Sequence, residues 1–193
     1  PLTYRNVNGF VFPDTDIDCA PAMFATIDDL EQYYPFVKKF DVAVQAGGNV
    51  GIFPAKLAER FKVVYTFEPD ADNFNCLAHN AMLSNVIKFQ CALGDRHEGI
   101  KMWVNPSNVG AHYVDGTGEI PTLMIDDLNL QTLDFLMLDV EGYEHRALLG
   151  GRYTINEYHP LVVLEEKGHG KRYGEGDAGK WLIGIGYKEV ARV

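Results

Sequence analysis

The sequence of 193 residues has few cysteines, and none of them stands in a metal-binding or redox spacing. Cys19, Cys76 and Cys91 are odd in number, so they do not form a complete set of disulfide pairs. No two of them make the Cys-x-x-Cys pattern shared by zinc sites and thiol oxidoreductases. We therefore expect reduced, packed thiols and no metal site.

Long apolar runs and basic clusters are also missing. No apolar stretch approaches the roughly 18 residues that a membrane-spanning helix needs. The first residues, Pro-Leu-Thr-Tyr-Arg-Asn, lack the basic and apolar parts of a signal peptide. A formal charge of -10 without a Lys- or Arg-rich block disfavours a phosphate backbone as partner. We expect a cytoplasmic protein that binds neither nucleic acid nor a membrane.

The chain has enough hydrophobic residues to form a folded core. The hydrophobic content of 47% and the length of the chain suit one domain with a sizeable interior. We expect residues 1–40 to form an N-terminal arm and helix packed on a core of residues 41–193. From Asp41 onward, strand and helix patterns alternate, which predicts an α/β fold with a mostly parallel sheet and helices on both faces.

The arm contains a short apolar segment and an acidic run. Residues 9–13 predict a strand, and Thr26 is a candidate cap for a helix that begins at Ile27. Aspartates 14, 16 and 18 resemble the start of a calcium loop. Cys19 stands where such a loop requires glycine, so we expect a solvated turn instead.

The core divides into five predicted strands with helices between them. Apolar runs predict the strands 42–46, 62–67, 86–93, 133–138 and 159–165. Residues 50–61, 74–81 and 144–149 have helical patterns, and a last helix and strand are predicted around Gly186 and Tyr187. An extra strand at 100–104 precedes a long polar loop at 105–118, which is of the kind that often serves as a lid or binding segment.

The most informative segment is the run 42–51, Val-Ala-Val-Gln-Ala-Gly-Gly-Asn-Val-Gly, together with Glu68 at the end of the next strand. Gly47 and Gly51 can adopt positive φ and allow a ligand to approach the backbone closely. A carboxylate about 20 residues further on suits two ribose hydroxyls. The pattern predicts a nucleoside cofactor.

The glycine spacing favours a single nucleoside over a dinucleotide. A dinucleotide fingerprint needs glycine at three positions that are occupied here by Gly47, Asn49 and Ile52. Glycines four apart better suit S-adenosylmethionine, and a turn with no ligand is the other alternative. The run 174–180 has the glycine and lysine spacing of a P-loop, but Trp181 replaces the Ser or Thr that binds Mg²⁺, so an NTPase is disfavoured.

Further motifs follow the glycine turn. They are Thr66-Phe67-Glu68-Pro69, Ala92-Leu93-Gly94-Asp95, Ile125-Asp126-Asp127-Leu128, Leu138-Asp139-Val140-Glu141-Gly142-Tyr143-Glu144 and the closing Gly186-Tyr187. With these motifs the chain resembles FkbM-type S-adenosylmethionine-dependent methyltransferases from about Asp41 to the C-terminus. The resemblance implies a Rossmann-like class I methyltransferase fold with a seven-stranded sheet, and O-methylation of a small molecule or sugar. It also shows two departures, since the family typically has Asp in place of Gln45 and often has Lys in place of Met137.

Strand ends that share one rim of a parallel sheet supply the candidate site residues. The cofactor-binding candidates are Gln45, Gly47, Asn49, Val50, Gly51, Glu68, Pro69, Asp70, Ala92, Leu93 and Asp139. Asp139 is the first candidate for a catalytic or acceptor-orienting carboxylate, followed by Glu141 and Glu165. The alternative for Glu141 is that it binds backbone N–H groups at a helix start. His169 is a further candidate base in a glycine-rich loop.

Three functions stay open at this stage. The first is a methyltransferase acting on a small-molecule or carbohydrate acceptor. The second is a nicotinamide-dependent oxidoreductase, which the glycine spacing opposes. The third is a non-catalytic domain that keeps the fold as an interaction module, which Gln45 keeps in consideration. The identity of the acceptor and the oligomeric state leave no signal in the sequence.

Overall fold

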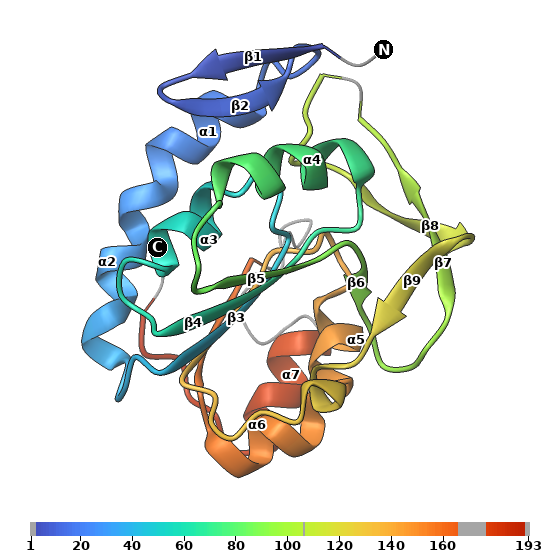
Figure 1. Ribbon diagram of the computed structural model, residues 1–193. Coiled ribbons are helices and arrows are strands. Elements are labelled where there is room, and N and C mark those ends of the chain that lie inside the picture. The colour runs from blue at the N-terminus through green and yellow to red at the C-terminus, as the bar shows by residue number, and fades with distance from the viewer. Residues whose placement is uncertain (1–2, 106, 166–176, 192–193) are drawn as a thin grey trace.

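A computed structural model of the chain describes residues 3–105, 107–165 and 177–191. Its central sheet has five strands in the order β11-β10-β3-β4-β5, and every neighbouring pair is parallel (Figure 1). The strands are β3 (Val42–Ala46), β4 (Val63–Phe67), β5 (Val86–Phe89), β10 (Phe135–Leu138) and β11 (Leu161–Leu164). The order reverses between β3 and β10, which makes this pair the topological switch point.

One face of the sheet is covered by the C-terminal helices. Side chains alternate along each strand, so Val44 and Leu136 point to the same face. They pack against α5 (Glu144–Leu149), α6 (Arg152–Tyr158) and α7 (Asp177–Gly184). The strands therefore read as continuous apolar runs, because both faces of the sheet are buried.

The opposite face is covered by the preceding helices. Ala43, Val64 and Phe135 point this way and pack with residues of α2 (Leu30–Tyr33) and α3 (Ile52–Leu57). The helix α4 (Ala71–Asn80) follows β4, and Ala81 just beyond it joins the same cluster. The predicted helix at 50–61 is shorter in the structure, where α3 begins after Gly51.

A second, mixed sheet stands beside the first. Its order is β6-β9-β7-β8, with β6 (Ala92–Leu93), β7 (Gly99–Trp103), β8 (Tyr113–Thr117) and β9 (Ile120–Leu123). Two predictions are corrected here. Residues 86–93 form two strands, because β5 pairs with β4 whereas β6 pairs with β9. The loop predicted at 105–118 contains β8, which pairs with β7.

The arm is a hairpin followed by short helices. Strands β1 (Tyr4–Val7) and β2 (Phe10–Pro13) pair antiparallel, and α1 (Cys19–Thr26) and a 3₁₀ turn (Ile27–Asp29) lead into α2. Further 3₁₀ turns lie at Tyr34–Phe36 and Ile125–Leu128. Thr26 ends α1 instead of capping a helix, because its hydroxyl donates to the carbonyls of Ala22 and Met23.

Asp16 is not part of a solvated turn, contrary to the prediction. Its exposed fraction is 1%. Its carboxylate accepts hydrogen bonds from the backbone N–H groups of Cys19 and Ala20, at 3.2 and 3.0 Å, and so caps α1. Asp14 and Asp18 are exposed as predicted.

The count of seven strands is wrong for the described residues, in which the central sheet has five. The predicted strand around Gly186 and Tyr187 is instead the C-terminal cap of α7. Gly186 has a φ of +95°, and the N–H groups of Gly186 and Tyr187 donate to the carbonyls of Ile183 and Leu182. This is a Schellman motif, in which glycine adopts the left-handed conformation that closes a helix.

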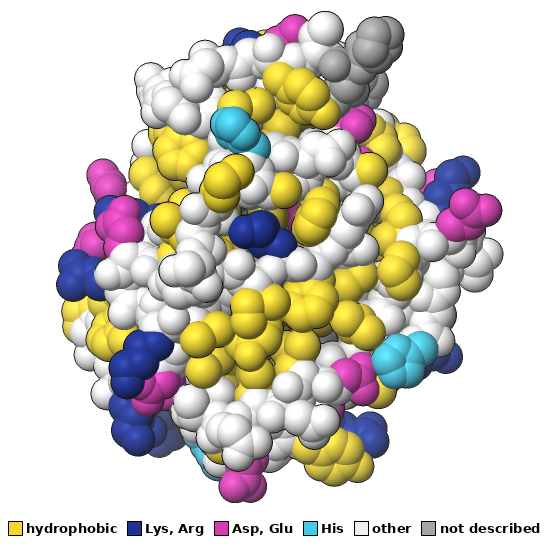
Figure 2. Space-filling model, in the orientation of Figure 1, with side chains coloured by type: hydrophobic (Ala, Val, Ile, Leu, Met, Phe, Trp, Pro, Cys, Tyr) yellow, Lys and Arg dark blue, Asp and Glu magenta, His cyan; other side chains and the backbone are white. Residues whose placement is uncertain are grey.

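Exposed hydrophobic residues mark one edge of the central sheet. Hydrophobic side chains gather in the middle of the face seen in Figure 2, over β5, which is one edge strand of the central sheet. Met82, Leu83 and Ile87 are the large exposed hydrophobic residues of β5 and the turn before it. Within the described residues, no helix is long and apolar enough to cross a bilayer.

The packing of Gly47 gives a first prediction. A Cβ atom at this position would lie 1.9 Å from the carbonyl oxygen of Asp139, and φ is +83°. Gly47→Ala should lower the free energy of unfolding by more than about 4 kcal/mol, the exceptional range for single substitutions. Denaturant unfolding followed by circular dichroism measures it.

Gly9→Ala is the matched control, because its φ is +90° and an added Cβ would meet nothing within 4 Å. It isolates the cost of positive φ, about 1–2 kcal/mol. Equal losses in the two variants would contradict the close approach of Gly47 to β10.

Candidate functional site

A cavity of about 420 Å³ lies at the carboxyl ends of β3, β4, β10 and β11. Its wall includes Gly47 and Asn49 after β3, Glu68 and Pro69 after β4, and Asp139 after β10. It therefore opens at the switch point of the sheet, where open parallel sheets bind their ligands. Its size suits one nucleoside-sized ligand with room beside it.

The turn after β3 uses its own amides. Gly47, Asn49 and Gly51 have positive φ values of +83°, +47° and +95°. The N–H groups of Gly47 and Gly48 both donate to the carbonyl of Phe67, and that of Gly51 donates to Gly48. The N–H of Val50 donates to the Asn49 side chain. With the Asn49 N–H bound to Glu68, all five amides of residues 47–51 are engaged within the protein.

Glu68 is the buried carboxylate of the site. Its exposed fraction is 5%, and each oxygen accepts one backbone N–H, from Asn49 at 2.7 Å and from Asp70 at 2.8 Å. Burial raises the pKa of Glu68 to about 8, although both amide hydrogen bonds act to lower it. In the ionised form each carboxylate oxygen has a second lone pair, so Glu68 then has acceptor capacity toward the cavity.

Gln45 lies behind the glycine turn. It is 1% exposed, its amide nitrogen donates to the carbonyl of Gly47 at 2.7 Å, and its amide oxygen accepts from the Thr66 hydroxyl at 2.6 Å. The side chain therefore orders the turn from beneath. Met137, the other departure from the family pattern, lies on the cavity wall.

The carboxylates after β10 and β11 share the cavity. Asp139, Glu141 and Glu165 all line it. Glu141 has a φ of +50°, an uncommon backbone conformation for a non-glycine residue, in the sharp turn that follows β10. The carboxylate of Glu144, not that of Glu141, accepts the N–H groups of Val140 and Gly142, at 3.3 and 3.0 Å. Glu144 thus binds backbone N–H groups at the start of α5, and the same role considered for Glu141 stays a prediction.

The predicted site residues separate into two groups. Those on the wall of the cavity are Gly47, Asn49, Glu68, Pro69, Ala92, Leu93, Asp139, Glu141 and Glu165. Among the described residues that line the cavity, Gln45, Val50, Gly51 and Asp70 are not included. Val50 is fully buried, and Asp70 caps α4 by accepting the N–H groups of Asp72 and Asn73. His169 and residues 174–176 lie outside the described residues.

Sequence reasoning missed two further parts of the wall. The arm contributes Met23, Leu30 and Tyr33, and the loop before β8 contributes Val109 and His112. The acidic lining of the cavity extends to the arm. Burial raises the pKa of Tyr33, and the negative charges of Asp29 and Glu165 raise it further. A helical pattern identifies arm residues as buried but not the cavity on which they lie.

Tyr143 was also missed, although it belongs to a quoted motif. It lines the cavity beside Asp139, and its hydroxyl donates to Glu98 at 3.0 Å. Arg146 donates to the Tyr143 hydroxyl and to Asp95 at 2.7 Å, and its guanidinium lies over the Tyr143 ring. This network fixes the ring at the edge of the cavity.

All three cysteines are buried and free, as predicted.

Five parallel strands, a glycine turn and a cavity at the switch point define a Rossmann-like α/β protein with a nucleoside-type site. The family model described as the methyltransferase FkbM domain matches residues 45–185. The chain belongs to the FkbM methyltransferase family. The match begins after the arm, which therefore lies outside it.

A solved methyltransferase structure has the same fold. A methyltransferase FkbM from Methylobacillus flagellatus KT has 19% sequence identity and a TM-score of 0.54, over 88% of this chain and 49% of that one. Phosphoethanolamine N-methyltransferase 1 from Haemonchus contortus, with 12% identity and a TM-score of 0.47, matches over 85% of this chain and 30% of its own. The chain thus spans about half, or less, of these structures. Among curated proteins, none matches it.

The raised pKa of Glu68 predicts a pH dependence of stability. Its folded-state pKa of about 8 exceeds the ordinary value of 4.5. Between pH 4.5 and pH 8 the folded protein therefore binds more protons than the unfolded chain does. The contribution of Glu68 to the free energy of unfolding should therefore decrease as the pH rises from about 4.5 to about 8. Denaturant unfolding of wild type and Glu68→Gln at several pH values tests this. Parallel pH curves for the two proteins would contradict the buried, protonated carboxyl.

Proposed function

We propose that the chain binds S-adenosylmethionine in this cavity and transfers its methyl group to a hydroxyl of a small-molecule or carbohydrate acceptor. The observation that carries the proposal is the placement of Glu68. Its carboxyl lies at the end of β4, on the cavity wall, and is hydrogen-bonded to the glycine turn after β3. Family membership supports the same chemistry.

The turn fits this cofactor better than a dinucleotide. A pyrophosphate binds to free backbone N–H groups at a glycine turn and helix start. The five amides from Gly47 to Gly51 already donate within the protein, as described above. Adenosine with an amino-acid tail carries no pyrophosphate, so it does not need a cluster of free amides at this turn. The ribose hydroxyls instead require an acceptor, which Glu68 supplies.

The cavity residues suit a reaction that requires alignment and exclusion of water. The bound cofactor supplies an electrophilic methyl group on a sulfonium, and an acceptor oxygen attacks it in line. Asp139 and Glu141 lie on the wall after β10, where a carboxylate can orient an acceptor hydroxyl and accept its proton. Glu165, after β11, is the third candidate on that side.

The charges of the wall favour neutral or cationic acceptors. Among the described residues that line the cavity, the acidic ones are Asp29, Glu68, Asp139, Glu141 and Glu165, and none is Lys or Arg. His112 is the single basic type among them. A field of one sign repels ligands of the same sign, so a strongly anionic acceptor is disfavoured.

Calorimetric titration with S-adenosylmethionine, S-adenosylhomocysteine and NAD⁺ tests the proposal. We expect micromolar binding of the first two and none of NAD⁺. Glu68→Ala should weaken S-adenosylhomocysteine binding at least about 10-fold, because the ribose loses its acceptor. Glu119→Ala, at an exposed glutamate of the second sheet region, is the control and should bind as wild type does.

Three results would count against the proposal. Unchanged affinity of Glu68→Ala would remove Glu68 from the cofactor site. Failure of wild type to bind either sulfur compound would favour a non-catalytic module. Binding of NAD⁺ would instead favour an oxidoreductase.

Asp139→Asn tests the acceptor side. With an acceptor found by screening for methyl transfer from labelled S-adenosylmethionine, kcat should fall about 100-fold or more, because a general base is lost. Affinity for S-adenosylhomocysteine and the melting temperature should change little, since the side chain keeps its shape. Asp115→Asn, an exposed aspartate on β8, is the control. Full turnover of Asp139→Asn would exclude this role.

A further inference from the structure

We propose that Asp16, in the N-terminal arm, is a positioning residue of the cofactor site, which holds the loop 107–112 against the glycine turn. The inference rests on the proposed binding of S-adenosylmethionine. It assigns to the arm a function in building the pocket, in addition to its packing on the core.

Asp16 joins two segments that are distant in sequence. One oxygen of its buried carboxylate accepts the N–H of Cys19 at 3.2 Å and the N–H of Val109 at 3.3 Å. The other accepts the N–H of Ala20 at 3.0 Å. Helix α1 and the loop thus share one carboxylate. The N–H groups of residues 17 and 18 add a second connection, because both donate to the carbonyl of Ser107.

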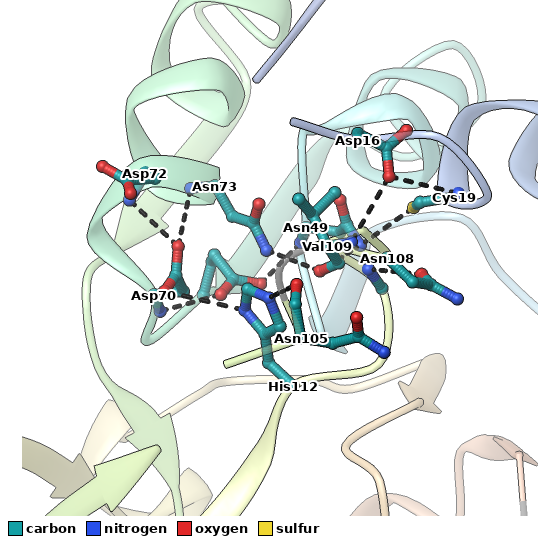
Figure 3. A network of polar contacts seen from close by, with 12 residues as sticks. Asp16, Cys19, Asn49, Asp70, Asp72, Asn73, Asn105, Asn108, Val109 and His112 are labelled. Atoms are coloured by element: carbon teal, nitrogen blue, oxygen red, sulfur yellow. Dashed lines mark hydrogen bonds and ion pairs between the residues drawn. The ribbon is translucent and has the colours of Figure 1, made fainter. Parts of the chain in front are cut away.

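Val109 passes this connection on to the site (Figure 3). Its carbonyl accepts the side-chain amides of Asn49 at 3.3 Å and Asn73 at 2.8 Å. Asn49 belongs to the glycine turn, and Asn73 lies in the first turn of α4. Both line the cavity, as does Val109 itself. The loop therefore bridges the two elements that flank Glu68.

The contacts close into a ring around Glu68. The N–H of Asn49 and the N–H of Asp70 donate to its two carboxylate oxygens. Asp70 in turn lies 3.6 Å from the ring nitrogen Nδ1 of His112, and the other nitrogen of that ring is 3.3 Å from the carbonyl of Asn105. The loop is thus held at Val109 and again at His112, with the glutamate between these two points.

Close packing makes the arrangement sensitive to displacement. The amide of Asn49 lies 3.4 Å from the Cys19 sulfur. A Cβ added to Gly110 would lie 3.0 Å from that sulfur and 3.3 Å from the same amide. Arm, loop and turn therefore lie in close contact at this point. An anchored loop spares the cofactor the cost of ordering these groups on binding.

Asp16→Ser separates the two contacts of the carboxylate. A serine hydroxyl lies one bond closer to the backbone than a carboxylate oxygen, so it does not reach Val109, whereas Asp18 remains the N-cap residue of α1. Asp16→Asn keeps an oxygen where both the helix and the loop can donate to it. We expect Asp16→Ser to bind S-adenosylhomocysteine at least 10-fold more weakly than wild type in calorimetry, and Asp16→Asn to restore affinity to within about threefold.

Two readouts separate positioning from general stability. Circular dichroism should show both variants folded at the temperature of titration. Hydrogen exchange of the free protein, read by mass spectrometry, should be faster for the peptide containing Val109 in Asp16→Ser and close to wild type in Asp16→Asn. Asp14→Ser makes the same chemical change at an exposed aspartate two residues before Asp16, and should alter neither affinity nor exchange.

The outcomes also distinguish this inference from the proposed function. If wild type binds S-adenosylhomocysteine and folded Asp16→Ser binds it equally well, the positioning role is wrong while the proposed function stands. Unchanged exchange at Val109 would likewise overturn it. If wild type does not bind the compound, the proposed function fails, and the positioning role fails with it.

Discussion

The approach of Gly47 to the backbone of β10 is the constraint on which the site depends. The carbonyl oxygen of Asp139 occupies the space that any side chain at position 47 would need. Because β3 and β10 are parallel neighbours, this contact lies where the strand order reverses. It brings the turn after β3 and the carboxylates after β10 together on the wall of one cavity. Because Gly47 has no side chain, the turn can lie against the backbone of Asp139 while both residues line the cavity.

Gln45 shows how the turn accepts a departure from the family pattern. Its amide nitrogen donates to the carbonyl of Gly47, and its amide oxygen accepts from Thr66. An ionised aspartate has only acceptors and cannot donate to that carbonyl. The glutamine therefore satisfies a turn whose carbonyl points inward. The loss of charge at this position is a local solution to hydrogen bonding, and by itself gives no reason to infer a decayed site.

Much of the core could be predicted from sequence, and the reasons are local. Strand β3 and helix α5 were predicted with the bounds that the structure has, because apolar runs and helical spacing depend on near neighbours. Residues 86–93 were misassigned since the same apolar residues serve two strands, and pairing partners distant in sequence decide where one ends. Gly186 was read as part of a strand although it closes α7, because the capping bonds depend on a helix whose end the pattern does not locate.

Some residues of the cavity wall could be predicted from the sequence, and others could not. Gly47, Glu68 and Asp139 could be predicted, because each follows a strand and strand ends meet on one rim. Met23 and Tyr33 could not, since nothing in their spacing shows that the arm returns across that rim. Nor could the burial of Asp16, whose partner Val109 is 93 residues away. Acidic residues in a short run resemble a solvated turn until a distant N–H group is placed against one of them.

The arm therefore connects two aspects of the site. Through Asp16 and Val109 it contacts the side of the cavity where the glycine turn and Glu68 lie. Through Leu30 and Tyr33 it forms wall on the side of β10 and β11, near the candidate catalytic carboxylate Glu165. Because α1 and α2 are joined by a short 3₁₀ turn, a shift of one contact displaces the other. Under the proposed function, the arm thus contributes wall both to the cofactor side and to the acceptor side of the cavity.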